Sequence, residues 1–232
     1  MNDAPVTTTK QAKRPGPETP MERTGKKPAV WVLFFVVVAV ALAVDLGLKA
    51  WSFQHVADMP ISVRTAEGGG PEVLVMAPDN DEWVVAQDIG LTDRPERVPH
   101  HDPTVVVPGL LHFQLTLNTG AVFGTGQGGR PIFISVSIIA VIVILVLVYR
   151  SPVKGRMYQI ALALILGGAL GNLYDRVMFS AVRDMLHMLP STGLWPWIFN
   201  PADVALVCGV GLVLVVSWVS DRAAAKQAKA AK

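Results

Sequence analysis

The chain has 232 residues, of which 51% are hydrophobic and only 16% are charged, and its formal net charge is +2. About a quarter of the residues are charged in an ordinary soluble domain, and a nucleic-acid-binding domain carries a basic excess, so both classes fit poorly. The single cysteine, Cys208, excludes an intramolecular disulfide framework and, by itself, a cysteine-based zinc site. The apolar residues gather in four blocks, and these blocks decide the class of protein.

Each of the four apolar segments is close to the roughly 20 residues that a helix needs to cross a hydrocarbon core. We predict transmembrane helices at about 29–49, 131–149, 157–174 and 201–219. None of these segments has the persistent polar stripe of an amphipathic helix on a soluble protein. The predicted fold class is therefore an all-α membrane protein, with residues 29–219 as one four-helix domain.

The first apolar segment has two possible interpretations, a cleavable secretory signal or a retained helix. Its apolar core, residues 29–44, is longer than the roughly 7–15 residues of the apolar region of a signal peptide. The charged residues Asp45 and Lys49 follow it, and we predict a retained signal-anchor helix. Residues 1–28 are rich in Thr, Pro and Lys, which predicts a disordered cytoplasmic tail, and residues 220–232 form a second tail.

Lysine and arginine residues indicate the orientation of the chain in the membrane. They concentrate in three segments that four crossings place on one side, namely residues 10–27, 150–156 and 222–232. The long segment 50–130 on the opposite side has more acidic than basic residues. Both termini of this multi-pass protein are therefore expected in the cytoplasm.

Residues 58–108 form the largest part of the chain expected outside the membrane, and they are rich in Gly, Pro and acidic residues. Short β-like runs at 72–76, 82–86 and 104–107 precede a longer run at 110–117, which leads into Asn118. We expect a small external β-structure within an enlarged first external loop.

Ionisable residues in or beside a spanning segment are costly and are functional candidates by default. The predicted orientation puts all of them near the external ends of the helices: Asp45, Lys49, Asp175, Arg176, Asp184 and Asp203. Asp45 and Lys49 are spaced i, i+4, and a salt bridge at the end of the first helix is the structural interpretation. Asn172, Asp175 and Arg176 share one helix face, and Asp175 with Arg176 is a candidate structural clamp.

Asp203 stands at the predicted start of the fourth helix. Asn200 is a suitable N-cap, and Pro201 suits the first helical position. This places Asp203 in the first turn, where the helix dipole favours a carboxylate. The alternative to a functional role is an ordinary acidic residue at a helix start.

Asp184 precedes Asp203 by 19 residues, and the prolines between them exclude a single helix that carries both. A loop that folds back would bring the two carboxyl groups face to face. Two carboxyl groups that share a site do not both ionise easily, so one keeps a proton and the other activates water, as in aspartic proteases. The alternative is a surface ion pair of Asp184 with Arg183 or Arg176.

Other motifs receive structural interpretations. Gly167 and Gly171 form a G-x-x-x-G pair, which predicts close helix packing. His100 and His101 lie in a Pro-rich acidic stretch and are expected in a surface loop rather than at a metal site. The sequence contains neither the H-E-x-x-H nor the G-x-S-x-G motif.

Four stretches in order resemble the motifs of one family, the bacterial lipoprotein signal peptidases (signal peptidase II). The family patterns are D-x-x-x-K, N-x-G-A-A-F, G-N-x-x-D-R, and V-x-D followed by F-N-x-A-D. The matching stretches are 45–49 (DLGLK), 118–124 (NTGAVFG), 171–176 (GNLYDR), and 182–184 (VRD) with 199–203 (FNPAD). Any one match is weak, but four in order in a four-helix chain are highly specific.

The resemblance implies an intramembrane aspartic endopeptidase of the bacterial inner membrane, with a small periplasmic β-cradle. Its activity would remove the signal peptide of a diacylglyceryl-modified prolipoprotein by cutting just before the lipidated cysteine. It implies Asp184 and Asp203 as the catalytic pair. The supporting residues that match the motifs are Asp45, Lys49, Asn118, Gly120, Asn172, Asp175, Arg176 and Asn200. It implies no metal or other cofactor. The expected partners are the lipidated prolipoprotein and membrane lipid, without nucleic acid, and the expected state is a monomer.

The sequence departs from the family pattern at a few positions. Val122 replaces the second alanine of N-x-G-A-A-F, Met185 stands where Phe is frequent, and segment 58–108 exceeds the usual external loop. A transporter or scaffold subunit is the alternative from another class, and it predicts a polar pathway toward mid-bilayer, whereas the acids here lie at one end. A second alternative is an intramembrane protease of the G-x-G-D kind, but that tetrapeptide is absent.

Overall fold

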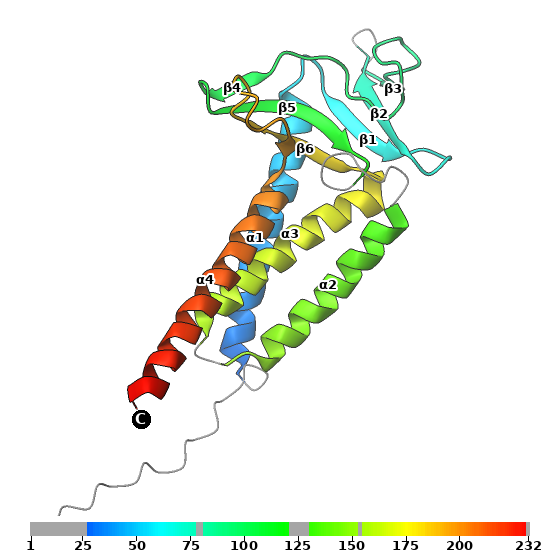
Figure 1. The fold of residues 1–232 in the computed structure, drawn as a ribbon. Helices are drawn as coiled ribbons and strands as arrows, with labels where there is room; N and C mark the ends of the chain where they lie inside the picture. The colour runs from blue at the N-terminus through cyan, green and yellow to red at the C-terminus, as the bar shows by residue number, and fades with distance from the viewer. Residues whose placement is uncertain (1–26, 78–80, 121–129, 153–154, 231–232) are drawn as a thin grey trace, which may run out of the picture.

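Four long helices dominate the computed structural model, which describes residues 27–77, 81–120, 130–152 and 155–230. They are α1 (Pro28–His55), α2 (Arg130–Arg150), α3 (Arg156–Phe179) and α4 (Pro201–Ala230). Each is long and apolar enough to cross a membrane, which confirms the four predicted spans. The helix α3 is central, because it packs against each of the other three (Figure 1).

The helices extend beyond their predicted ends. The helix α1 continues from residue 49 to His55, and α3 continues from residue 174 to Phe179. The helix α4 runs on to Ala230, because the segment after residue 219 is rich in Ala and Lys, which are strong helix formers. The C-terminal tail is therefore a helical extension as far as Ala230. Residues 1–26, which include most of the predicted disordered tail, lie outside the described residues.

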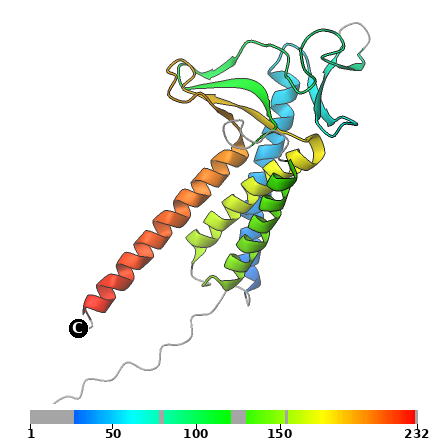
Figure 2. The same ribbon diagram turned by 45° about the vertical axis from the view of Figure 1, so that its right-hand side comes forward.

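Two small antiparallel sheets lie together at one end of the helices, as Figures 1 and 2 show. The first sheet, in strand order, contains β1 (Ile61–Thr65), β2 (Pro71–Met76) and β3 (Trp83–Val85). The second contains β4 (Thr104–Val107), β5 (Leu111–Asn118), β6 (Val182–Met188) and β7 (Ile198–Phe199). All four predicted β-like runs form strands, whereas β1, β6 and β7 were not predicted. The pairing of β5 with β6 joins the α1–α2 connection to the α3–α4 connection.

The two sheets and the end of α1 share one apolar core. Its buried members are Phe53, Val56, Ile61, Val63, Val73, Val75, Ala86, Leu115 and Met185. Successive side chains of a strand point to opposite faces. Met185 of β6 therefore enters this core, whereas its neighbour Asp184 points to the opposite face, toward the helix ends.

The helices α1 and α3 approach each other closely through glycines. A Cβ atom at Gly167 would lie 2.7 Å from the Cβ of Ala41, and one at Gly171 would overlap the carboxylate of Asp45. A larger residue at position 167 would require a shift of α1, and one at position 171 would require the carboxylate of Asp45 to move. This geometry confirms the close packing that the G-x-x-x-G pair predicts.

The outward faces of the helices remain apolar and exposed. Ile132 of α2 and Val207 and Leu214 of α4 are each at least 65% exposed. Contiguous apolar surface on this scale is unfavourable in water and suits contact with lipid. The end of the bundle that carries the sheets therefore lies on one side of the hydrocarbon region.

Candidate active site

The start of α4 holds Asp203 in a reciprocal cap. The backbone N–H of Asp203 donates to Oδ1 of Asn200 at 3.1 Å, and the backbone N–H of Asn200 donates to Oδ2 of Asp203 at 3.2 Å. This confirms the predicted N-cap and the place of Asp203 in the first turn. The side chain of Asn172, from α3, donates to the other oxygen, Oδ1 of Asp203, at 2.9 Å.

Asp184 lies on strand β6, directly opposite Thr116 of β5, and not in the loop that the sequence predicted. Asp184 is only 2% exposed, so the alternative prediction of a surface ion pair is wrong. The side chain of Asn200 donates to Oδ1 of Asp184 at 2.6 Å, and that of Asn118 donates to Oδ2 at 3.3 Å. A strand can hold this carboxyl group more firmly than a loop, because its backbone is paired with β5 at this position.

Two asparagines connect Asp184 to Asp203. The Nδ2 group of Asn200, besides its bond to Asp184, donates to Oδ1 of Asn172 at 3.1 Å. Asn172 then uses its own Nδ2 group to reach Asp203. The two carboxyl groups, which come from β6 and α4, therefore belong to one hydrogen-bonded group between the sheet and the helix ends.

The environment of Asp184 favours its neutral form. Burial raises the pKa of this carboxyl group from 3.8 to about 7, and the negative charge of Asp203 adds to the increase. The hydrogen bonds from Asn200 and Asn118 act in the opposite direction, because they stabilise the carboxylate. Asp184 is thus able to exchange a proton near neutral pH.

Behind the asparagines, Lys49 forms a buried ionic cluster. Its Nζ atom lies 2.8 Å from Oδ2 of Asp45, which confirms the predicted i, i+4 salt bridge, and 3.4 Å from Oδ2 of Asp175. It also donates to Oδ1 of Asn172 at 3.1 Å. The other oxygen of Asp45 accepts the backbone N–H of Ala202 at 2.9 Å. The cluster therefore fixes α1, α3 and the first turn of α4 relative to one another.

Asp175 binds Arg183, the residue that precedes Asp184 in the chain. The guanidinium Nη2 lies 2.9 Å from Oδ1 of Asp175, and both Nε and the backbone N–H of Arg183 donate to Oδ2 at 3.3 Å and 3.0 Å. The predicted clamp at Asp175 thus joins it to Arg183 of β6 rather than to its neighbour Arg176. Arg176 donates to the carbonyl oxygens of Asn172 and Gly120, each at 3.4 Å. No sequence spacing pointed to the contact with Arg183, because it depends on how β6 returns over α3.

The end of β5 completes the group. Asn118 accepts the backbone N–H of Gly120 on its Oδ1 at 3.1 Å while its Nδ2 group faces Asp184. Residues 121–124 of the predicted N-x-G-A-A-F match lie outside the described residues. All ten site residues expected from the sequence are described, and these contacts join them into one continuous network.

Outside this network, the histidines differ from expectation in one respect. His100 is exposed, as expected for a surface loop, whereas His101 is buried, at 8% exposure. Among the residues that the structure describes, no three His, Cys, Asp or Glu side chains are grouped to hold a metal ion.

Comparisons with known proteins identify the family. A family model described as signal peptidase (SPase) II matches residues 81–219. A lipoprotein signal peptidase of Desulfitobacterium hafniense is 40% identical over 117 residues, which are 50% of this chain and 75% of the relative. One of Listeria monocytogenes is 33% identical over 141 residues, 61% of this chain and 85% of the relative.

The fold also has a solved counterpart. A structure described as a bacterial membrane enzyme aligns with a TM-score of 0.55 and 22% identity over 85% of this chain and 91% of its own. At that identity the likeness concerns the fold alone. The family match and the curated relatives carry the assignment: this chain belongs to the signal peptidase II family of aspartic proteases.

Proposed function

We infer that this chain, as a member of the family, removes signal peptides from prolipoproteins. We propose that the chain cleaves diacylglyceryl-modified prolipoproteins on the N-terminal side of the lipidated cysteine and that Asp184 and Asp203 form the catalytic pair. The observation that carries this proposal is the hydrogen-bonded path from Asp184 through Asn200 and Asn172 to Asp203.

The two carboxyl groups have complementary environments. Asp203 is half-buried at the N-terminus of α4, where its carboxyl oxygens accept two hydrogen bonds, one from the side chain of Asn172 and one from the backbone N–H of Asn200. Asp184 is buried with a pKa raised to about 7, so it keeps a proton more readily. We therefore assign Asp203 as the base and Asp184 as the acid of a pair that titrates as a unit.

Hydrolysis then needs no covalent intermediate. Asp203 takes a proton from water as the water oxygen attacks the scissile carbonyl carbon, and Asp184 gives its proton to the carbonyl oxygen. In the resulting diol, the C–N bond breaks while Asp203 returns its proton to the leaving nitrogen. Asp184 recovers a proton from a diol hydroxyl as the new carboxyl group forms. Both side chains end in their starting states.

The supporting residues hold this pair rather than react. Asn118 and Asn200 orient Asp184, and Asn172 orients Asp203. The others fix the elements that carry them. These are Asp45, Lys49, Gly120, Asp175 and Arg176, through the contacts of the ionic cluster and the end of β5.

The proposed site lies at the external membrane interface. Basic residues of both tails and of segment 150–156 favour the cytoplasm for the opposite end of the bundle. Trp195 and Trp197, each 39% exposed, lie just before α4, as in the aromatic belts of membrane proteins. The acyl chains of a substrate would stay in lipid there while water reaches the two carboxyl groups.

Purified enzyme in lipid nanodiscs tests the proposal with one prolipoprotein in two forms, diacylglyceryl-modified and unmodified. Intact-mass analysis of the products should show cleavage of the lipidated form just before its modified cysteine. Asp184→Asn and Asp203→Asn should each abolish cleavage while the protein remains in the membrane. Asp93→Asn is the matched control, because the Asp93 side chain is 61% exposed on the external loop and should leave the rate unchanged. Full activity of either site variant would refute the catalytic pair, and an uncut lipidated form would favour a transporter or scaffold.

A further inference from the structure

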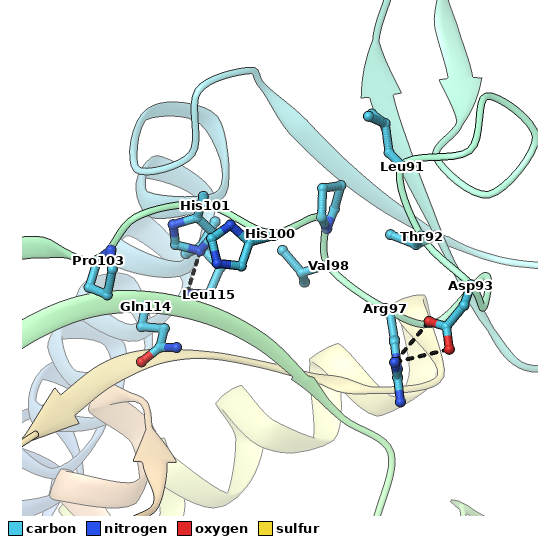
Figure 3. A pocket seen from close by; sticks show the side chains of 11 residues that line it. Leu91, Thr92, Asp93, Arg97, Val98, His100, His101, Pro103, Gln114 and Leu115 are labelled. Atoms are coloured by element: carbon cyan, nitrogen blue, oxygen red, sulfur yellow. Dashed lines mark hydrogen bonds and ion pairs between the residues drawn. The ribbon is translucent and has the colours of Figure 1, made fainter.

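His101 attaches the segment before β4 to the middle of β5, as Figure 3 shows. Its Nε2 atom accepts the backbone N–H of Leu115 at 3.0 Å, and its Nδ1 atom lies 3.1 Å from the carbonyl oxygen of Asp102. A carbonyl oxygen can only accept, so Nδ1 carries the proton and Nε2 offers its lone pair. The two contacts together require a neutral ring in one tautomer.

The amide that His101 binds belongs to an irregularity in β5. Phe113 pairs with Leu186 of β6, and Thr116 pairs with Asp184. Three steps along β5 therefore match two steps along β6, which means that β5 contains one extra residue. Such a bulge leaves a residue outside the regular ladder, and a buried N–H group without a partner is costly. The ring of His101 supplies the acceptor for this part of β5.

The neighbouring strand explains why a side chain does this. The pairing of β4 with β5 reaches Thr104 opposite Phe113, and Pro103 precedes it. Proline lacks an N–H group and cannot donate a ladder hydrogen bond. His101 lies two residues before Pro103 in the chain. Its ring nitrogen accepts the hydrogen bond that a backbone carbonyl of a longer β4 would accept. Leu115, held in this way, is 5% exposed and packs in the core that also contains Met185.

The bulge decides which residues of β5 face the proposed acid. Beyond it, Thr116 lies opposite Asp184 and Asn118 lies opposite Val182, which lets Asn118 donate to Asp184. A shift by one residue would turn every following side chain of β5 to the other face of the sheet. The contact at Leu115 therefore acts on the geometry around Asp184 without touching it.

We propose that His101 is a positioning residue for proteolysis, whose neutral ring holds the β5 bulge and thereby the register of β5 against Asp184. The inference rests on the proposed function, because it assigns Asp184 to the catalytic pair. It gives a role to the external segment before β4.

Three variants test whether the hydrogen-bond acceptor of His101 is required, as opposed to the size of its side chain. His101→Leu keeps the approximate volume and removes the acceptor, whereas His101→Gln keeps an acceptor oxygen at similar reach. His100→Leu is the matched control, because His100 is the exposed neighbour. Cleavage of a lipidated prolipoprotein is measured in nanodiscs, with rates expressed per amount of protease-resistant, folded enzyme. Hydrogen exchange of the peptide that contains Leu115 is measured in the same samples.

We expect His101→Leu to lower kcat roughly ten- to hundredfold with little change in KM, because a displacement of about 1 Å at reacting groups has an effect of this size. Exchange at Leu115 should become faster in this variant. His101→Gln and His100→Leu should match the wild type in both measurements. A wild-type kcat in His101→Leu, or equal losses in His101→Leu and His101→Gln, would overturn the proposal.

Two provisions keep the test decisive. Where His101→Leu does not accumulate, His101→Gln decides the outcome, because retained activity and protection support the proposal and their loss overturns it. Exchange at Leu115 needs no catalysis, so it reports on the His101 contact even if Asp184→Asn proves fully active. Failure of the catalytic pair and failure of the His101 contact therefore give different results.

Discussion

Replacing Lys49 by Met is expected to destabilise the helix bundle strongly, because it removes a cation from a cluster closed to solvent. The side chains of Lys49, Asp45 and Asp175 are all fully buried, and Arg183 supplies the second cation. Two positive charges therefore balance two negative ones. In the variant, Asp175 keeps Arg183, whereas Asp45 loses the Nζ atom 2.8 Å away and keeps the N–H of Ala202.

The expected loss of stability follows from this charge imbalance. Removing one partner of a buried ion pair costs about 3–5 kcal/mol, which is a large part of the roughly 5–15 kcal/mol that stabilises a typical domain. Adding Asp45→Asn to Lys49→Met removes the uncompensated charge and keeps an oxygen that accepts the hydrogen bond from the backbone N–H of Ala202. The double variant should therefore recover about 1–3 kcal/mol relative to Lys49→Met alone.

The free energy of unfolding is measured by titration from mild detergent into SDS, followed by tryptophan fluorescence. Lys226→Met on the exposed end of α4 is the control and should change the free energy by less than about 0.5 kcal/mol. A Lys49→Met protein as stable as this control would refute the argument that the cluster depends on its charge balance. So would a double variant less stable than Lys49→Met.

Two further predictions use the same protein. Gly171→Ala should lower the free energy of unfolding by about 1–3 kcal/mol, because the new Cβ would overlap the carboxylate of Asp45. Gly47→Ala is the control: its new Cβ meets no atom within 4 Å, so this variant should be neutral or slightly stabilising. The pKa of Asp184 is raised from 3.8 to about 7, so its stabilising effect is complete below pH 3.8 and is lost as the pH rises to about 7. Asp184→Asn should flatten the pH dependence of the unfolding free energy over this window. The value of kcat/KM should fall above about pH 7, where the proposed acid loses its proton, and a continued rise through this range would contradict that assignment.

The helices and the start of α4 were predictable because their signals are local. Apolar length alone identifies the spans, and Asn200, Pro201 and Asp203 form a cap within four consecutive residues. The i, i+4 spacing of Asp45 and Lys49 likewise specifies a salt bridge without knowledge of the rest of the fold. These features depend on interactions between residues that are close in the sequence, so the sequence alone predicts them.

The parts that were missed depend on distant segments. Strand β6 carries Asp184, but its pairing is with β5, more than 60 residues earlier in the chain, and its own sequence has no regular polar alternation. The partner of Asp175 is Arg183 because β6 returns over the end of α3, so adjacency to Arg176 was misleading. His101 is buried because it binds the amide of Leu115 at the bulge in β5, and no local sequence pattern predicts that bulge.

The bond from the amide of Ala202 to Asp45 joins the last helix to the first. A ribosome makes α1 first and α4 last, so Asn200 and Asp203 arrive only when the rest of the bundle already exists. Until then Asp184 has neither its amide donor from Asn200 nor its acidic partner. On the proposed assignment of Asp184 and Asp203, a chain that has not yet inserted α4 lacks half of the catalytic pair and cannot cut other proteins.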